Sequence, residues 1–124
     1  MARTRTTARK AGSSFERLIA DTLAAHIDDR IDRRPKMGSK DRGDIGGVRL
    51  SPVFRSGRVV IECKSTRTLS LGTWANEAET ERGNDDAVAG IIAHKRHGKA
   101  AGLDQWVTLT VRDLCALLTG ERPE

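Results

Sequence analysis

The sequence predicts a single domain of mixed α/β class, in which helices cover a small β-sheet. Apolar residues recur at helical spacing near the N-terminus, and a run of β-branched residues follows between residues 58 and 64. Helical and extended patterns then alternate to the C-terminus. A chain of 124 residues can build one core of this kind, but it is too short for two ordinary domains.

The first helix is expected to begin at Ser13 or Ser14 and to run to about Arg30. Its apolar face consists of Phe15, Leu18, Ile19, Leu23 and Ile27. Residues 1–12 are basic and show no hydrophobic periodicity. We therefore expect a disordered tail there, followed by one domain over residues 13–120.

Two extended runs after this helix predict a β-hairpin. The first carries Ile45, Val48 and Leu50, and the glycines within it indicate a bulge or a close backbone approach. The second runs from Arg58 to Lys64 and opens with consecutive β-branched residues, which makes it the strongest strand signal in the chain.

The second half of the chain predicts a helix and two further strands. The helix is expected from Leu71 to about Arg82, with Trp74 in core packing or in a dimer interface. A buried strand is expected over residues 87–94, and a short one over residues 105–109.

A closing helix completes the predicted domain. Thr110 is expected to cap its N-terminus and Gly120 to end it. Its inward-facing side chains would be Leu114, Leu117 and Leu118. Trp106, in the preceding strand, is assigned to the core.

The charge of the chain indicates a polyanionic partner. The net charge is +5, and basic residues gather within residues 3–10, 30–42 and 95–99. Only 3% of the residues are aromatic, which argues against a reader of single-stranded nucleic acid built on stacked aromatic platforms.

The two cysteines, Cys63 and Cys115, lie in unrelated contexts, and no paired-cysteine zinc spacing is present. The sequence also lacks an apolar run of membrane-spanning length. We therefore expect a cytoplasmic protein with free thiols and no membrane partner.

A charged pair interrupts the strongest strand. Side chains alternate along a strand, so Glu62 and Lys64 share one face while Cys63 continues the buried face. One interpretation is that the charged face is simply exposed to solvent. The other is a functional site, because Asp44 begins the neighbouring strand and can approach Glu62 in a hairpin.

Two carboxylates brought together repel each other unless a cation lies between them. Hard oxygen ligands suit Mg²⁺, with Mn²⁺ as a possible substitute. A lysine beside such an ion can orient a water or offset charge on a phosphate. Together with the basic groups, these residues predict metal-assisted hydrolysis of a phosphodiester.

The pattern resembles the PD-(D/E)xK nuclease superfamily, through "GD" at Gly43–Asp44 and "ECK" at Glu62–Lys64, which closes an apolar strand. More narrowly, residues 13–118 resemble the small Holliday junction resolvases of archaea and phages. The segments that carry this resemblance are "GSSFERLIA", "RRPKMGSKDRGDIGG", "VVIECKS" and "GIIAHKRHG…DQWVTLTVRDLCALL".

The resemblance implies a restriction-endonuclease-like α/β fold and a set of site residues. Asp44 and Glu62 match the metal-ligating carboxylates, and Lys64 matches the catalytic lysine. The backbone carbonyl of Cys63 matches a further metal ligand. Glu16 matches a glutamate on the first helix that reaches the metal site.

Two alternatives remain open within this set. Ser13-x-x-Glu16 also fits a capping box, in which Glu16 would bond back to the Ser13 amide. Gly43 stands where the family most often has proline, which leaves Asp41 as a rival of Asp44 for the ligand position.

The resemblance implies a homodimer that cuts branched double-stranded DNA at two sites, and a host cytoplasm if the protein is phage-encoded. A two-fold dimer would match the approximate symmetry of a four-way junction. Expected DNA contacts are Arg3, Arg5, Lys10, Arg33, Arg34, Lys36, Lys40, Arg42, Ser65, Arg67, Lys95 and Arg96. The alternatives are a flap, nicking or exonuclease activity of the same superfamily, or a DNA-binding module without chemistry.

Overall fold

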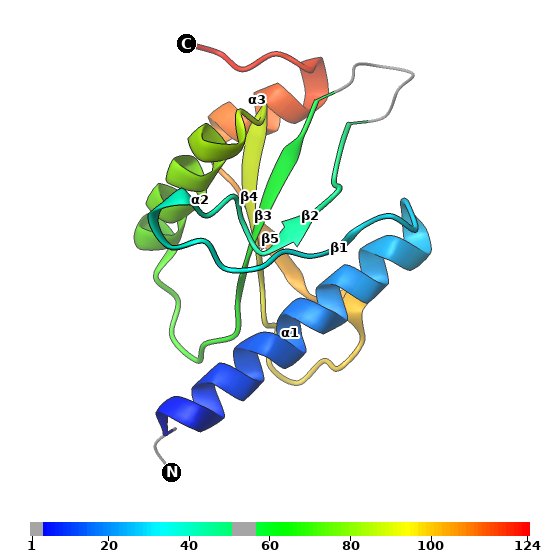
Figure 1. Ribbon diagram of the computed structural model, residues 1–124, viewed down its shortest axis with the longest axis vertical. Helices are drawn as coiled ribbons and strands as arrows, with labels where there is room; N and C mark the ends of the chain where they lie inside the picture. Colours follow the sequence, from blue (N-terminus) through cyan, green and yellow to red (C-terminus); the bar gives the residue numbers. More distant parts are fainter. Residues whose placement is uncertain (1–3, 51–56) are drawn as a thin grey trace.

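A five-stranded mixed sheet forms the centre of the computed structural model, which describes residues 4–50 and 57–124 (Figure 1). The strands lie side by side in chain order. They are β1 (Asp32–Arg33), β2 (Ile45–Gly46), β3 (Val59–Lys64), β4 (Ala89–His94) and β5 (Trp106–Thr108). Strands β3 and β4 are parallel, and the other neighbours are antiparallel. The mixed α/β class is therefore confirmed.

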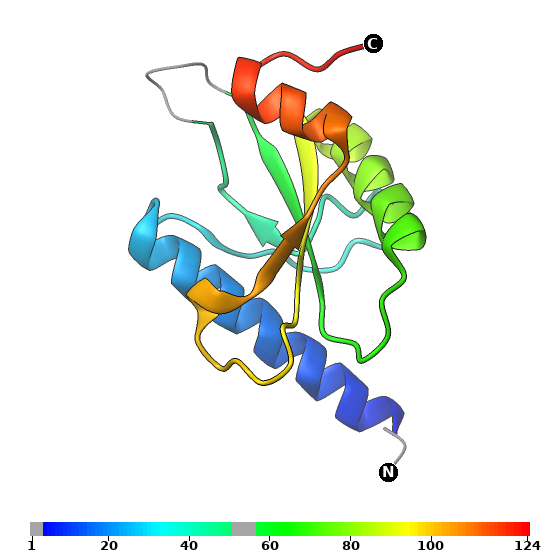
Figure 2. The same ribbon diagram turned by 180° about the vertical axis from the view of Figure 1, so that it is seen from behind.

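Within the described residues, three helices and two short 3₁₀ turns complete the fold. The helices are α1 (Arg5–His26), α2 (Leu71–Asp85) and α3 (Val111–Thr119), and the turns are η1 (Gly38–Lys40) and η2 (Gly102–Asp104). Helix α2 lies on one side of the sheet, and α3 lies on the other (Figures 1 and 2). No helix in the described ranges joins the length and the apolar character that crossing a membrane requires.

Alternation along β3 decides which helix each side chain meets. Ile61 on one face packs with Phe15 and Ile19 of α1, and Cys63 is partly buried against the same cluster. On the opposite face, Trp74 of α2 packs against Ile92 of β4. The core therefore has a layer on each side of the sheet, and the packing role expected for Trp74 is confirmed.

Helix α2 approaches the sheet closely because β4 carries a glycine. A Cβ atom at Gly90 would lie 2.9 Å from the backbone oxygen of Ala78, which is closer than real Cβ contacts. The connection β3–α2–β4 joins two parallel strands through a covering helix, the usual solution for a parallel pair.

The expected hairpin is confirmed in part. Ile45 of β2 pairs with Ile61 of β3, and an isolated bridge joins Arg49 to Arg58. The connection over residues 51–56 lies outside the described residues.

The first helix begins earlier than the sequence predicts. Thr4 caps it by accepting a hydrogen bond from the Thr7 amide at 3.0 Å, so residues 5–12 belong to α1 rather than to a disordered tail. The described side chains between Arg5 and Lys10 are exposed. Because they face no core, they carry no hydrophobic period that could reveal the helix.

The closing helix has the predicted ends but a different inward face. Thr110 caps α3 and Gly120 ends it, as expected. Leu114 and Leu118, however, are 44% and 75% exposed, while Asp113 is buried. The prediction that these two leucines pack inward is wrong, because hydrogen bonds of Asp113 turn that side of the helix toward the sheet. The same prediction is confirmed for Leu117, which is partly buried against Val59, Ala89 and Ala116.

The core assignment of Trp106 is also wrong. Its side chain is 48% exposed, because β5 is the last strand of the sheet and has a neighbour on one side only. The Arg96 guanidinium lies 4.3 Å from the centre of its ring. Both cysteines are free thiols, as the sequence predicts.

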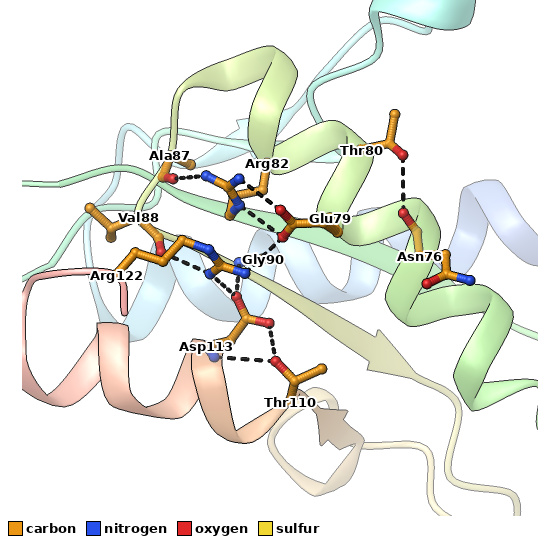
Figure 3. A network of polar contacts seen from close by, with 10 residues as sticks. All are labelled: Asn76, Glu79, Thr80, Arg82, Ala87, Val88, Gly90, Thr110, Asp113 and Arg122. Carbon is orange, nitrogen blue, oxygen red and sulfur yellow. Dashed lines mark hydrogen bonds and ion pairs between the residues drawn. The ribbon is translucent and has the colours of Figure 1, made fainter. Parts of the chain in front are cut away.

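A polar network, buried at Asp113 and half exposed at Glu79, joins α2, α3 and the C-terminal segment (Figure 3). Asp113 accepts hydrogen bonds from the Gly90 amide at 3.1 Å and from Arg122 at 2.6 Å. Arg122 also donates to Glu79 at 2.8 Å, and Glu79 in turn accepts from Arg82. Burial alone would raise the pKa of Asp113, but hydrogen bonds from Thr110, Arg122 and the Gly90 amide outweigh it and lower the pKa.

We predict that Asp113→Ala destabilises the protein by about 3 kcal/mol, because it leaves the largely buried Arg122 and the Gly90 amide without their acceptor. Urea denaturation measures the free energy of unfolding. Arg112→Ala, at the exposed neighbouring position, is the matched control and should change stability by less than about 0.5 kcal/mol. Equal losses in the two variants would contradict the prediction.

Candidate functional site

The charged pair of β3 faces helix α2 rather than solvent. Glu62 is buried, with 6% of its surface exposed, so the interpretation as a solvent-exposed face is wrong for this residue. Its carboxyl group hydrogen-bonds to that of Glu81. The Lys64 ammonium lies 2.5 Å from the Glu77 carboxylate. Glu77 and Glu81 are one helical turn apart on α2 and match the spacing of Glu62 and Lys64 on the strand.

Asp44 lies beside Glu62, as the sequence predicts. Its amide donates to the Ile61 carbonyl at 2.8 Å, which fixes the backbone against β3. Its carboxylate accepts a hydrogen bond from the Cys63 amide at 2.7 Å and hydrogen-bonds to the Glu62 carboxyl group. The side chain is buried, so the two carboxyl groups meet away from bulk water.

Glycine precedes Asp44 for a geometric reason. Gly43 has φ of +94°, and a Cβ atom there would lie 2.7 Å from the Val60 side chain and 3.0 Å from the Ile61 carbonyl oxygen. Proline cannot adopt this φ, since its ring holds φ near −65°. Gly43 therefore adopts a backbone conformation that proline cannot, and this conformation delivers Asp44 to the strand.

The carboxyl groups of Asp44 and Glu62 differ in their affinity for a proton. Burial raises the pKa of Glu62, and the hydrogen bonds to Asp44 and Glu81 raise it further. Burial also opposes ionisation of Asp44, but hydrogen bonds from Glu62, Lys36 and the Cys63 amide lower its pKa. Asp44 is therefore the ionised partner and Glu62 carries the proton.

Lys36 supplies the nearest positive charge. Its ammonium lies 2.6 Å from Asp44 and 3.9 Å from Glu16. Burial alone would lower the pKa of Lys36, but the hydrogen bond to Asp44 and the surrounding carboxylates raise it. The sequence assigns Lys36 to DNA contact, whereas the structure places its ammonium inside the acidic cluster.

Glu16 also belongs to this cluster. The N-cap of α1 is Thr4, nine residues before Ser13, so the capping-box alternative for Glu16 is wrong. The Glu16 side chain is buried, and its Oε1 lies 3.6 Å from Arg33. Burial raises the pKa of Glu16, and the nearby charge of Asp44 raises it further.

The rival ligand Asp41 has another role. Its carboxylate accepts a hydrogen bond from the Met37 amide and so holds the turn at η1. Asn84, at the end of α2, fastens the same turn by donating to the carbonyls of Ser39 and Asp41 at 3.0 and 2.9 Å. Asp44, and not Asp41, is therefore the aspartate that contacts Glu62.

The carboxyl groups of this cluster are donors that suit a hard divalent cation, although the described residues do not already form a complete set of metal ligands. Among residues 4–50 and 57–124, no three His, Cys, Asp or Glu side chains are spaced to hold a metal ion. Four buried or partly buried carboxyl groups nevertheless gather here, from Glu16, Asp44, Glu62 and Glu81. Buried oxygens of Glu16 and Glu81 lack hydrogen-bond partners within these residues. Carboxylate oxygens are the ligands that Mg²⁺ and Mn²⁺ prefer, and an added cation would relieve the repulsion.

Cys63 contributes through its backbone only. Its thiol lies in the apolar cluster beneath α1, where burial raises its pKa. Its amide donates a hydrogen bond to the Asp44 carboxylate. The backbone carbonyl of the same residue is the one that the resemblance implies as a metal ligand.

The expected DNA contacts divide into free and engaged side chains. Arg34 is engaged, because it donates to the Arg42 carbonyl at 2.7 Å and lies 3.4 Å from buried Asp85. Arg33 pairs with Glu16. Within the described ranges, no ion pair engages Arg5, Lys10, Lys40, Arg42, Arg67 or Lys95. Ser65 follows Lys64 directly and is partly buried, and Arg3 lies outside the described residues.

No protein-family model, no curated protein and no solved structure matches this chain. A functional assignment therefore depends on the chemistry of the site itself.

We predict that the metal-free protein loses stability between pH 7.0 and 8.5. Glu62 has a folded-state pKa above its ordinary value of 4.5, so its contribution is complete below pH 4.5 and declines as pH rises toward the folded pKa. When the folded state binds one proton more than the unfolded state, the free energy of unfolding falls by about 1.4 kcal/mol per pH unit. The loss over this window is therefore up to about 2 kcal/mol. Urea denaturation in EDTA measures it.

Glu62→Gln should flatten this pH dependence, because its amide stays neutral at both pH values. Asp104→Asn, at an exposed position of η2, is the matched control and should keep the slope of the unsubstituted protein. If the free energy of unfolding of the unsubstituted protein does not change with pH over this range, the assignment of a proton to Glu62 is wrong.

Proposed function

We propose that this protein is a divalent-metal-dependent DNA endonuclease with a PD-(D/E)xK site, acting on branched DNA and foremost on four-way junctions. One observation carries the proposal: buried Asp44 and Glu62 make direct contact, and Lys64 follows on the same face of β3. This is the convergence of side chains that the superfamily pattern requires, and it arises from two separate segments of the chain.

Asp44 and Glu62 would hold the metal ion. The nearby carboxyl groups of Glu16 and Glu81 would add negative charge that favours binding of a cation. When bound, Mg²⁺ would supply a Lewis acid for the scissile phosphate and lower the pKa of a water. Lys64 would stabilise the charge that develops on the phosphate. Glu77 acts as a positioning residue, because it fixes the Lys64 ammonium at 2.5 Å.

Basic side chains near the site supply the phosphate contacts. The first turns of α1, the segment before α2 and the segment after β4 lie toward the same end of the molecule (Figures 1 and 2). They carry Arg5, Lys10, Arg67 and Lys95, which are free of carboxylate partners within the described ranges. Lys40 and Arg42 add positive charge beside the loop that delivers Asp44. This arrangement suits a duplex whose backbone crosses the acidic site.

Helix α3 supports assembly as a homodimer. Val111, Leu114 and Leu118 follow one another at spacings of three and four residues and are 75%, 44% and 75% exposed. Such a stripe on a surface helix has no partner within the described chain. A second copy would cover it and would give the paired sites that symmetric cleavage of a junction needs.

We predict that Asp44→Asn and Lys64→Ala each reduce Mg²⁺-dependent cleavage of a four-way junction by at least about 100-fold. Asp29→Asn, an exposed aspartate just after α1, is the matched control and should keep full activity. Circular dichroism checks that each variant is folded. Full activity in Asp44→Asn would defeat the site assignment.

Substrate preference tests the second half of the proposal. Junction, flap, nicked and linear DNA are compared at equal concentration, with the expectation that the junction is cut fastest. Faster cutting of linear ends would assign the protein to another activity of the same superfamily. Junction binding without cleavage in Mg²⁺ or Mn²⁺ would instead identify a DNA-binding module without chemistry.

A further inference from the structure

A cavity opens at the same end of the sheet as Lys64. It has a volume of about 480 Å³ and lies between the segment before α2, the end of β4 and strand β5. Its walls include Leu69, Leu71, His94 and Trp106, and Arg67 and Lys95 also line it. None of these residues is required by the carboxylate site. The volume falls in the range of pockets that bind small molecules.

Strand pairing connects this cavity to the proposed catalytic residues. Lys64 of β3 pairs with His94 of β4, and His94 pairs with Trp106 of β5. Directly paired residues project from the same face of a sheet, so these three side chains form one row. Neighbouring strands are about 4.8 Å apart, which places Trp106 about 10 Å from Lys64 along the row.

Trp106 presents an indole that the fold does not bury. Nearly half of its surface is exposed, and Arg96 lies against the ring. The other tryptophan, Trp74, is buried and packs against His94. Exposed aromatic rings beside positive charge are the means by which proteins hold the bases of unpaired strands.

The charges around the cavity have one sign. Arg67 and Lys95 have no carboxylate partner within residues 4–50 and 57–124, and no Asp or Glu lines the cavity. His97 also lines it and lies 3.0 Å from the Thr66 carbonyl oxygen through Nε2, so that nitrogen carries the proton. The cavity thus joins an apolar, aromatic interior to cationic side chains, which matches a base joined to a phosphate.

We propose that this cavity binds one unpaired nucleotide of the DNA substrate, with its base stacked on Trp106 and its phosphate held by Arg67 and Lys95. The inference rests on the proposed function, because it takes DNA as the substrate. It adds a specific feature to that function: recognition of a base released from pairing close to the cleavage site. A branch point is where such bases become available.

Binding of duplexes in EDTA tests the inference without any cleavage. One probe is a 20-base-pair duplex with a single unpaired 2-aminopurine, and the other is the same duplex fully paired. We expect the 124-residue chain to bind the first probe about tenfold more tightly and to quench its fluorescence through stacking. Trp106→Ala should abolish both effects, Trp106→Phe should keep most of each, and Arg67→Ala should weaken binding without removing the quenching.

Ile27→Ala is the matched control, since it removes an exposed apolar side chain outside the cavity and should leave the tenfold preference intact. Equal affinity for the two probes, or a preference that survives Trp106→Ala, would overturn the inference. A change from dimer to monomer in Trp106→Ala with an unchanged preference would also overturn it and would identify this face as an interface between copies.

The two proposals fail separately. A preference for the unpaired base that depends on Trp106, without cleavage in Mg²⁺, would leave the cavity assignment standing and remove the nuclease. Junction cleavage without such a preference would do the reverse.

Discussion

The contact between the carboxyl groups of Asp44 and Glu62 is the constraint on which the rest of the site depends. Two buried carboxyl groups can touch only if a proton or a cation stands between them, because their charges are poorly screened away from water. In the metal-free protein, Glu62 keeps a proton and Lys36 brings an ammonium to Asp44. A divalent ion would replace both, and this exchange is the physical link between the fold and the proposed chemistry.

The fold maintains this unfavourable contact by fixing the backbone around it. Gly43 lets the chain turn tightly against β3, and the amides of Asp44 and Cys63 both make hydrogen bonds across the two segments. Helix α2 then closes the face, placing Glu81 against Glu62 and Glu77 against Lys64. At the other end of the sheet, the network around Asp113 anchors α3 and the C-terminal segment.

Much of the site could be predicted because strand alternation is simple. Glu62 and Lys64 had to share a face, and Asp44 had to meet them if β2 and β3 paired. Glu77 and Glu81 were missed, although their spacing of one helical turn on the helix after β3 was a readable signal. The position of Lys36 could not be read, because it depends on the path of an irregular loop. Trp106 was misassigned because composition does not reveal that its strand is an edge.

The anomalous scattering of Mn²⁺ in a crystal of the 124-residue chain tests the metal site at Asp44 and Glu62 most directly. We expect one peak within coordination distance of carboxylate oxygens of both Asp44 and Glu62, with the Lys36 ammonium moved away from Asp44. The contradicting result is Mn²⁺ bound elsewhere or not at all, with Lys36 still paired to Asp44 and the two carboxyl groups still in contact.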